Sequence, residues 1–183
     1  MGAPAIDIND APGAAVTAVV LHPHPDMGGD RFNHVVDALY QSLPNGGFTA
    51  VRFDFSSSDP ETAVAEAGAV IDQCRGSRVA LIGYSFGAGV ALQVTDPGVL
   101  GWMLVAPYLG PSGPAAGALD ERPKLVLVPE HDQWTPPGRA EPLIAGWANT
   151  TVTTVAGADH FLHGGTGAVV AAALDWLGAL AEA

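Results

Sequence analysis

The chain has 183 residues, which fits one domain, and its 48% hydrophobic and 14% charged residues suffice for a packed core, so global disorder is excluded. Nineteen acidic residues against seven basic ones give a formal net charge of −12. Such a charge repels phosphate backbones and anionic bilayers, so we expect neither a nucleic-acid partner nor a membrane.

Two further features bear on the compartment. The one cysteine, Cys74, excludes an intrachain disulfide framework and a cysteine-rich zinc site. The first ten residues show no signal-peptide pattern, and the longest apolar stretch, 168–181, is interrupted by Asp175 and too short to span a bilayer. We therefore expect a single cytoplasmic domain over residues 1–183.

Short β-branched runs alternate along the chain with longer segments of helical pattern. The runs predict strands at 16–21, 48–55, 79–83, 102–105, 125–128 and 151–155. The longer segments predict helices at 33–43, 60–74, 87–95, 143–147 and 169–180. This alternation is typical of an α/β fold with a mostly parallel central sheet and helices on both faces. Residues 107–123, rich in glycine and proline, predict an irregular loop too short for a separate cap domain.

Chemistry is expected after the strands, because ligands of open α/β sheets bind beyond the carboxyl ends of the strands. After strand 79–83 comes Gly83-Tyr84-Ser85-Phe86-Gly87, a G-x-S-x-G pattern. In that pattern a serine sits on a sharp, strained strand-to-helix turn with its hydroxyl exposed. The pattern alone is weak in a chain with 23 glycines. The strand before it and the helix after it favour a nucleophilic serine over an incidental one.

A nucleophilic serine needs a base, and the base needs an orienting carboxylate. His160 follows the last predicted strand, and Asp132 follows the strand at 125–128. We therefore predict a catalytic set in the order Ser85, Asp132, His160. His163 is an alternative base on the same loop, and Glu130 is an alternative acid.

The loop after strand 16–21 reads His22-Pro23-His24-Pro25-Asp26. Two histidines and an aspartate at this spacing are similar to the zinc motif of metallo-β-lactamases, in which a further histidine normally follows where this chain has Met27. The alternative, which we favour, is that the two histidine side chains hold the loop by hydrogen bonds. The charges of Arg52-Phe53-Asp54-Phe55, at the end of the next strand, are likewise expected to tie loops together.

The histidine-rich loop, the serine turn, the acid loop and the final histidine loop occur in the order found in the α/β-hydrolase superfamily. The chain resembles that superfamily from Val16 to Leu180. Within it, the chain is similar to small cap-free bacterial serine esterases of the dienelactone-hydrolase kind, although true dienelactone hydrolases carry cysteine where this chain has Ser85. The resemblance implies a minimal fold without a cap domain, with Ser85 as nucleophile, His160 as general base and Asp132 as orienting acid.

The resemblance also implies an oxyanion hole, a pair of backbone N–H groups that bind the developing negative charge. The family's His-Gly-x-Pro loop corresponds to residues 22–25, where Pro23 replaces the glycine and has no N–H. We therefore expect the N–H groups of His24 and Phe86 to be the donors. Three aromatic residues are expected at the same edge of the sheet: Tyr108, Trp134 and Phe161. They either line a substrate pocket or serve only in packing.

These observations predict a serine hydrolase that cleaves carboxylic esters with small or short-chain acyl groups through an acyl-enzyme. Its partner is a small-molecule ester, and no cofactor or metal is expected. A thioesterase or amidase on the same three residues is an alternative. A non-catalytic ligand-binding member of the fold is another. A zinc hydrolase built on His22, His24 and Asp26 is the third.

Overall fold

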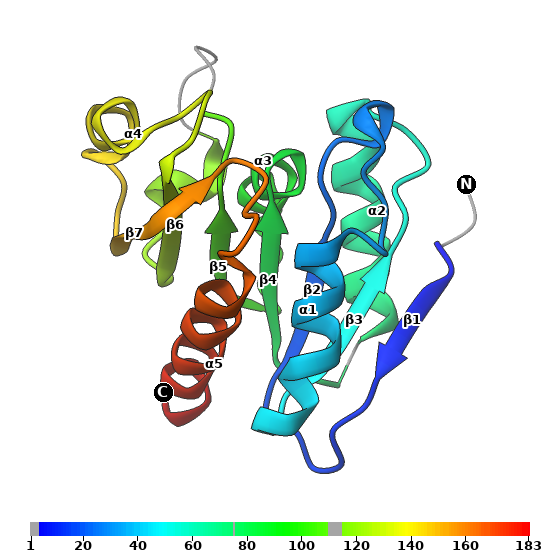
Figure 1. Ribbon diagram of the computed structural model, residues 1–183. Coiled ribbons are helices and arrows are strands. Elements are labelled where there is room, and N and C mark those ends of the chain that lie inside the picture. The colour runs from blue at the N-terminus through cyan, green and yellow to red at the C-terminus, as the bar shows by residue number, and fades with distance from the viewer. Residues whose placement is uncertain (1–3, 75, 110–114) are drawn as a thin grey trace.

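The computed structural model describes residues 4–74, 76–109 and 115–183. Seven strands form one sheet in the order β1-β3-β2-β4-β5-β6-β7 (Figure 1). The strands are β1 (Ile6–Asn9), β2 (Thr17–Leu21), β3 (Thr49–Phe53), β4 (Val79–Tyr84), β5 (Val99–Val105), β6 (Lys124–His131) and β7 (Thr150–Asp159). Edge strand β1 pairs antiparallel with β3, and the other neighbours pair in parallel.

Helices cover both faces of this sheet (Figure 1). They are α1 (His34–Ser42), α2 (Pro60–Gln73), α3 (Phe86–Gln93), α4 (Pro137–Ile144) and α5 (Thr166–Glu182), with 3-10 turns η1 (Pro25–Met27), η2 (Leu43–Gly46) and η3 (Ala116–Leu119). One core layer includes residues of α1 and α5, and the other includes residues of α2, α3 and α4. The predicted α/β fold, a mostly parallel sheet between two helical layers, is confirmed.

The two core layers explain why the central strands are apolar throughout. In β2, Ala18 and Val20 face the layer of α1 and α5, while Val19 and Leu21 face the layer of α2, α3 and α4. Successive side chains of a strand point to opposite faces, so a strand buried on both faces lacks the alternation of a half-exposed one. This packing fixes β2 and β4 at the centre of the sheet.

The sequence patterns missed or misplaced some elements. Strand β1 was not predicted, because its Ile-Asp-Ile-Asn alternation spans only four residues at the sheet edge. The helix predicted at 143–147 is wrong in position: α4 begins at Pro137, since proline suits a first helical turn, and the chain leaves the helix after Ile144. Strands β6 and β7 extend past the predicted 128 and 155.

The predicted irregular loop at 107–123 falls partly on residues 110–114, which lie outside the described residues; the described remainder contains η3. In the portion of the chain that is described, no helix combines the length and apolar character that crossing a bilayer requires.

Candidate active site

Ser85 occupies a single-residue turn between β4 and α3. Its backbone angles, φ 53° and ψ −110°, lie in a region that side-chain-bearing residues rarely adopt, and its N–H donates to the Val105 carbonyl at 2.9 Å. The strained turn that the G-x-S-x-G pattern predicts is present. The turn places Ser85, which is partly exposed, just beyond the carboxyl end of β4.

Glycine is required on both sides of this turn because the backbone is packed too closely for a side chain. A Cβ on Gly83 would lie 2.3 Å from the carbonyl oxygen of Gly87. A Cβ on Gly87 would lie 2.4 Å from the carbonyl oxygen of Leu21, at the end of β2. The two glycines therefore bring the start of α3 against β4 and against the loop that follows β2.

The pairing of β6 with β7 brings the acid and histidine loops together. His131 pairs with Asp159 in the sheet, so the next residues, Asp132 and His160, leave the two strands side by side. A register irregularity between Pro129 and His131 precedes this point. In Figure 1 the carboxyl ends of β4, β6 and β7 lie at the same edge of the sheet.

At that edge, Ser85, His160 and Asp132 form a continuous hydrogen-bonded chain. The Nε2 atom of His160 lies 3.0 Å from the Ser85 Oγ, and its Nδ1 atom lies 2.7 Å from the Asp132 Oδ2. The carboxylate accepts the Nδ1 proton, which leaves the Nε2 lone pair free to accept from the serine hydroxyl. The Asp132 side chain is fully buried and the His160 side chain is 4% exposed.

The surroundings of Asp132 keep it ionised despite its burial. Its second oxygen, Oδ1, accepts the backbone N–H groups of Trp134 and Thr135, each at 2.8 Å. Burial raises the pKa of the carboxyl, but the hydrogen bonds from His160 and from these two N–H groups outweigh that effect and hold the pKa below its ordinary value. An ionised Asp132 can orient the imidazole and stabilise its protonated form.

The His160 backbone is also held by residues that sequence reasoning did not identify. The Tyr84 hydroxyl donates to the His160 carbonyl at 2.9 Å, and the Gln133 amide oxygen accepts the His160 N–H at 3.2 Å. Burial first, then the Asp159 and Asp132 carboxylates, raise the pKa of Tyr84, which therefore stays a hydroxyl donor. Tyr84 occupies a variable position of the G-x-S-x-G pattern, so no sequence signal marks it.

The backbone N–H groups of His24 and Phe86 are available for a ligand. Neither donates a hydrogen bond to any residue that the structure describes. The two residues are neighbours, since the His24 ring lies edge-on to the Phe86 ring with centroids 5.0 Å apart. The His24 carbonyl accepts the N–H groups of Met27 and Gly29, at 3.1 and 3.0 Å, which fixes the fold of the loop. An oxyanion hole needs two such free N–H groups near the nucleophile, and Phe86 directly follows Ser85.

The His22 side chain holds this loop to the end of β3. Its Nδ1 donates to the Pro23 carbonyl at 2.6 Å, and its Nε2 accepts the Phe55 N–H at 2.8 Å. Burial lowers the pKa of His22, so it stays neutral and both ring nitrogens are used within the protein. This geometry supports the structural interpretation of His22 over the zinc interpretation. The expectation that the His24 side chain also holds the loop is not met at its Nδ1 atom, which is buried without a hydrogen-bond partner among the described residues. The described residues contain no group of three His, Cys, Asp or Glu side chains arranged to hold a metal.

The charges of Arg52 also tie elements together. Its guanidinium bonds the carboxylates of Asp7 at 3.3 Å and Asp37 at 2.7 Å, and donates to the Arg31 carbonyl. Asp54 accepts the Arg31 backbone N–H at 2.8 Å. These bonds join β1, β3 and α1, as expected for loop-holding charges.

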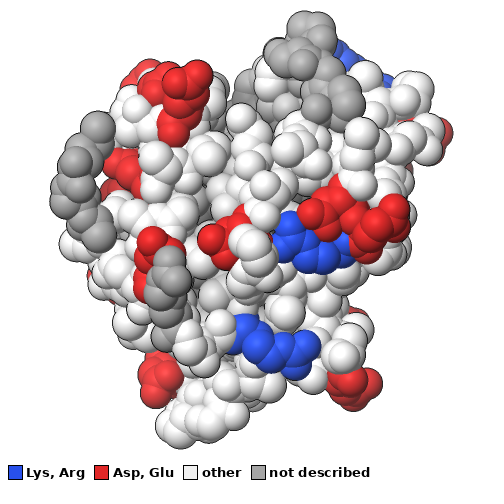
Figure 2. All heavy atoms as spheres, turned by 180° about the vertical axis from the view of Figure 1, so that it is seen from behind, with Lys and Arg blue, Asp and Glu red and all other residues white. Residues whose placement is uncertain are grey.

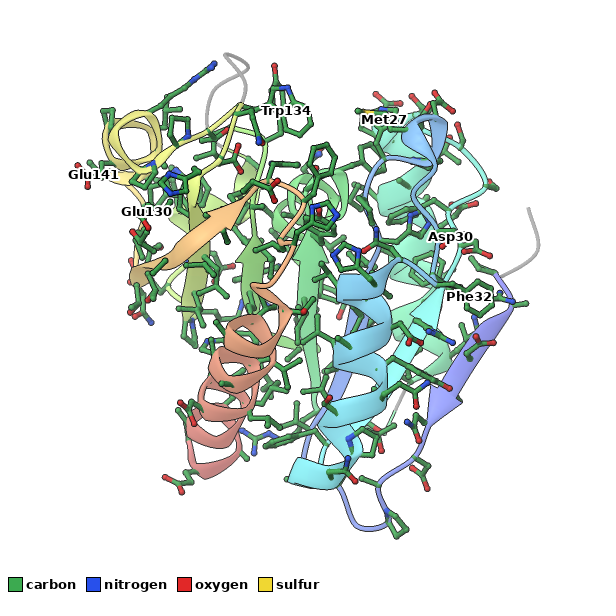
Figure 3. All side chains as sticks on the ribbon, in the orientation of Figure 1. Met27, Asp30, Phe32, Glu130, Trp134 and Glu141 are labelled. Carbon is green, nitrogen blue, oxygen red and sulfur yellow. The ribbon has the colours of Figure 1, made fainter. Side chains whose placement is uncertain are left out.

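Two aromatic residues contact the His160 imidazole, and a third, Tyr108, lies on a neighbouring loop. The Trp134 ring lies edge-to-face with the His160 imidazole at 4.1 Å, and with Phe161 at 5.7 Å. The Tyr108 loop adjoins them, because the Leu109 N–H donates to the Thr135 hydroxyl at 3.4 Å. Figure 3 shows Trp134 at the edge of the sheet where the site lies, across from Met27.

Comparisons with known protein sequences give a partial match. No protein-family model matches the chain. An uncharacterized protein of Rickettsia prowazekii is 34% identical over an alignment of 93 residues; the alignment covers 44% of this chain and 39% of that protein. The matched segment thus spans well under half of that relative's length.

Solved structures match nearly the whole chain. One, described as an alpha-beta serine hydrolase homologue from Coxiella burnetii, is 26% identical with a TM-score of 0.82, covering 94% of this chain and 90% of that one. Another, from Xanthomonas campestris and described as an α/β serine hydrolase without lid, is 25% identical with a TM-score of 0.75, covering 91% and 84%. The chain is an α/β hydrolase.

In the hydrolase, the alternative base His163 and the alternative acid Glu130 take part in other contacts. His163 is 77% exposed in its side chain; it stacks on His34 with centroids 5.7 Å apart and lies 3.7 Å from the Asp159 carboxylate. The Glu130 carboxylate accepts the Gly157 N–H at 2.7 Å. In the described part of the chain, His160 and Asp132 are therefore the histidine and carboxylate that line up with Ser85.

The hydrolase also has a cavity of about 360 Å³ at the end of the sheet opposite to Ser85, where β4 and β5 begin. Cys74, Val79 and Asp96 are among its lining residues, which lie near the amino ends of β4 and β5. It contains none of the candidate site residues, so we do not connect it with chemistry at Ser85.

Proposed function

We propose that this α/β hydrolase is a carboxylesterase of the serine type. The observation that carries the proposal is the relay of bonds from Ser85 Oγ to His160 Nε2, at 3.0 Å, and from His160 Nδ1 to Asp132, at 2.7 Å. A chain of this order turns a weakly nucleophilic hydroxyl into an effective one, because the base takes the proton as the new bond forms.

The proposed reaction proceeds in two halves. Ser85 Oγ bonds to the ester carbonyl carbon while its proton passes to His160 Nε2, giving a tetrahedral intermediate. The bond to the alcohol oxygen then breaks, and His160 returns the proton to the leaving alcohol. Water repeats the sequence on the acyl-enzyme and releases the acid. Asp132 keeps the imidazole in the required tautomer throughout, and no metal or cofactor enters these steps.

The N–H groups of His24 and Phe86 are the proposed oxyanion donors. Both lack a partner among the described residues, and their side chains are in contact. Removing one such donor in a serine hydrolase typically costs about 3 kcal/mol of barrier, or two to three orders of magnitude in turnover. The pair thus supplies a substantial part of the rate that the proposal requires.

The proposal is tested by labelling with a fluorophosphonate, which reacts covalently only with an activated serine. We expect labelling of the wild type and none of Ser85→Ala, with ester turnover falling by several orders of magnitude in Ser85→Ala and in His160→Ala. His163→Ala is the matched control, because this histidine is exposed and points to Asp159. Loss of activity in His163→Ala equal to that in His160→Ala would refute the assignment of the base.

Matched acetyl compounds separate the ester proposal from its alternatives. We expect kcat/KM for an acetate ester to exceed that for the corresponding thioester and amide. A higher value for the thioester or the amide would make the protein a thioesterase or an amidase on the same residues. An unlabelled protein with no activity on the three would favour a non-catalytic ligand-binding member of the fold.

A further inference from the structure

We infer that the enzyme selects esters whose leaving alcohol carries an aromatic ring, which packs on a wall formed by Tyr108, Trp134 and Phe161. This inference rests on the proposed function and adds the substrate class. These three residues, called the aromatic wall below, follow β5, β6 and β7 and lie at the edge of the sheet that holds Ser85.

Two side chains of the aromatic wall are exposed to solvent and the third is partly exposed. Tyr108 is 55% exposed and Phe161 is 44% exposed, and Trp134, which contacts both the Phe161 ring and the His160 ring, is partly exposed. Exposed aromatic surface beside a polar site is characteristic of binding sites. The exposed faces of Tyr108 and Phe161 are therefore free to receive a ligand.

Two residues of the wall, Trp134 and Phe161, lie on the leaving-group side because they contact His160. The ring centroids of Trp134 and Phe161 lie 4.1 and 5.9 Å from that of the imidazole. In the proposed mechanism the leaving oxygen must come within hydrogen-bond reach of His160 Nε2 to receive its proton. A group attached to that oxygen then lies next to the side chains around His160. The carbonyl oxygen instead turns toward the N–H groups of His24 and Phe86.

An aromatic ring gains more on this wall than an aliphatic ring of the same size. Both bury similar apolar area, but the aromatic ring can also adopt the edge-to-face geometry already seen between Trp134 and Phe161, which are inclined at 69°. Such pairs contribute enough beyond area burial to change a binding constant by about 2- to 10-fold. The expected preference is of that size.

The test compares benzyl acetate with cyclohexylmethyl acetate, whose acyl groups are identical and whose ring sizes match. Each kcat/KM is divided by the rate constant for alkaline hydrolysis of the same ester, which removes differences in intrinsic reactivity. We expect the normalised ratio to favour benzyl acetate by about 2- to 10-fold. The reversed pair, methyl phenylacetate and methyl cyclohexylacetate, carries the ring on the acyl side and should give a ratio near one.

Substitutions of the two exposed wall residues locate the effect. Phe161→Leu and Tyr108→Leu should each lower the benzyl preference toward one, and their exposure makes loss of folding unexpected. Phe32→Leu is the matched control, because Phe32 is also an exposed aromatic, at 57%, but contacts Arg31 and Arg52 near β1 at the other end of the sheet (Figure 3). It should leave the ratio unchanged.

The outcomes separate this inference from the proposed function. Hydrolysis of both acetates with a normalised ratio of one, or a preference for the aromatic ring only in the reversed pair, would overturn the inference and leave the esterase intact. A benzyl preference that survives in both wall variants would also overturn it. No hydrolysis of any of the four esters, together with an unlabelled Ser85, would overturn the proposed function and this inference with it.

Discussion

His22 shows how a single side chain determines the shape of the loop before the serine turn. It is buried, and it bridges the Pro23 carbonyl and the Phe55 N–H through its two ring nitrogens. The second bond requires a lone pair on Nε2, which the protonated ring lacks. Protonation therefore opposes both the burial and the bond, and the pKa of His22 is lowered in the folded protein by its burial.

This lowered pKa predicts a loss of stability in mild acid. As the pH falls below about 6.5, His22 takes up a proton in the unfolded chain more readily than in the folded chain. The free energy of unfolding therefore decreases as the pH decreases. The slope from one such group is at most about 1.4 kcal/mol per pH unit, and the contribution is constant well above pH 6.5. Urea denaturation between pH 5 and pH 8 measures it.

The matched variant for this prediction is His22→Gln, whose amide oxygen can accept the Phe55 N–H but does not titrate. We expect a shallower dependence of the free energy of unfolding on pH than in the wild type. His131→Gln, which changes an exposed histidine, should leave the dependence as it is. An unchanged slope in His22→Gln would show that His22 does not cause the acid sensitivity.

At the scale of elements, the serine turn is determined by how closely β4 and α3 approach each other. Gly83 and Gly87 have no room for a side chain because backbone atoms of neighbouring segments lie at their Cβ positions. Gly89, two residues further along α3, has no atom within 4 Å of its Cβ position. The three glycines are near in sequence, but the packing of the elements assigns them different roles.

Substitution by alanine should separate these roles. Gly83→Ala places a methyl group 2.3 Å from the Gly87 carbonyl, and we expect the protein to lose about 1 to 3 kcal/mol of unfolding free energy. Gly89→Ala should instead gain about 0.5 to 1 kcal/mol, because alanine favours a helix interior where space is open. Urea denaturation of both variants measures the difference. Equal stability of the two would contradict this account of the turn.

At the scale of the whole molecule, the net charge and the connection after β5 are the features that bear on the substrates we expect. Figure 2 shows acidic side chains spread over the face seen from behind, with fewer basic ones, in keeping with the net charge of −12. The connection between β5 and β6 contains the short turn η3 among its described residues. A segment of this length forms a rim more readily than a closed lid.

The expectation of an open rim leads to a prediction of short acyl chains. Each methylene of an acyl chain contributes about 0.8 kcal/mol only while protein surface covers it, so chain extension beyond the rim adds nothing. We expect kcat/KM for a series of p-nitrophenyl esters to be highest between acetyl and butyryl. A maximum at octanoyl or longer would show that the protein encloses a deep acyl channel.

Local patterns were sufficient for much of this architecture. Alternating apolar runs and helical segments predicted the parallel sheet and its helical layers, since burial on both faces of a central strand leaves a continuous apolar run in the chain. The Gly83–Gly87 pattern predicted a strained turn, because its requirement for glycine is met within five residues. The positions after strands marked Ser85, Asp132 and His160 as candidates, since parallel strands end at one edge.

Contacts between distant segments could not be anticipated in this way. The Tyr84 hydroxyl on the His160 carbonyl and the His22 ring on the Phe55 N–H join residues far apart in the chain. The choice of Asp132 over Glu130 as the partner of His160 depends on the register of β6 against β7. Strand register and loop contacts are determined by interactions between groups that meet only after folding. Composition and spacing along the chain therefore do not predict them.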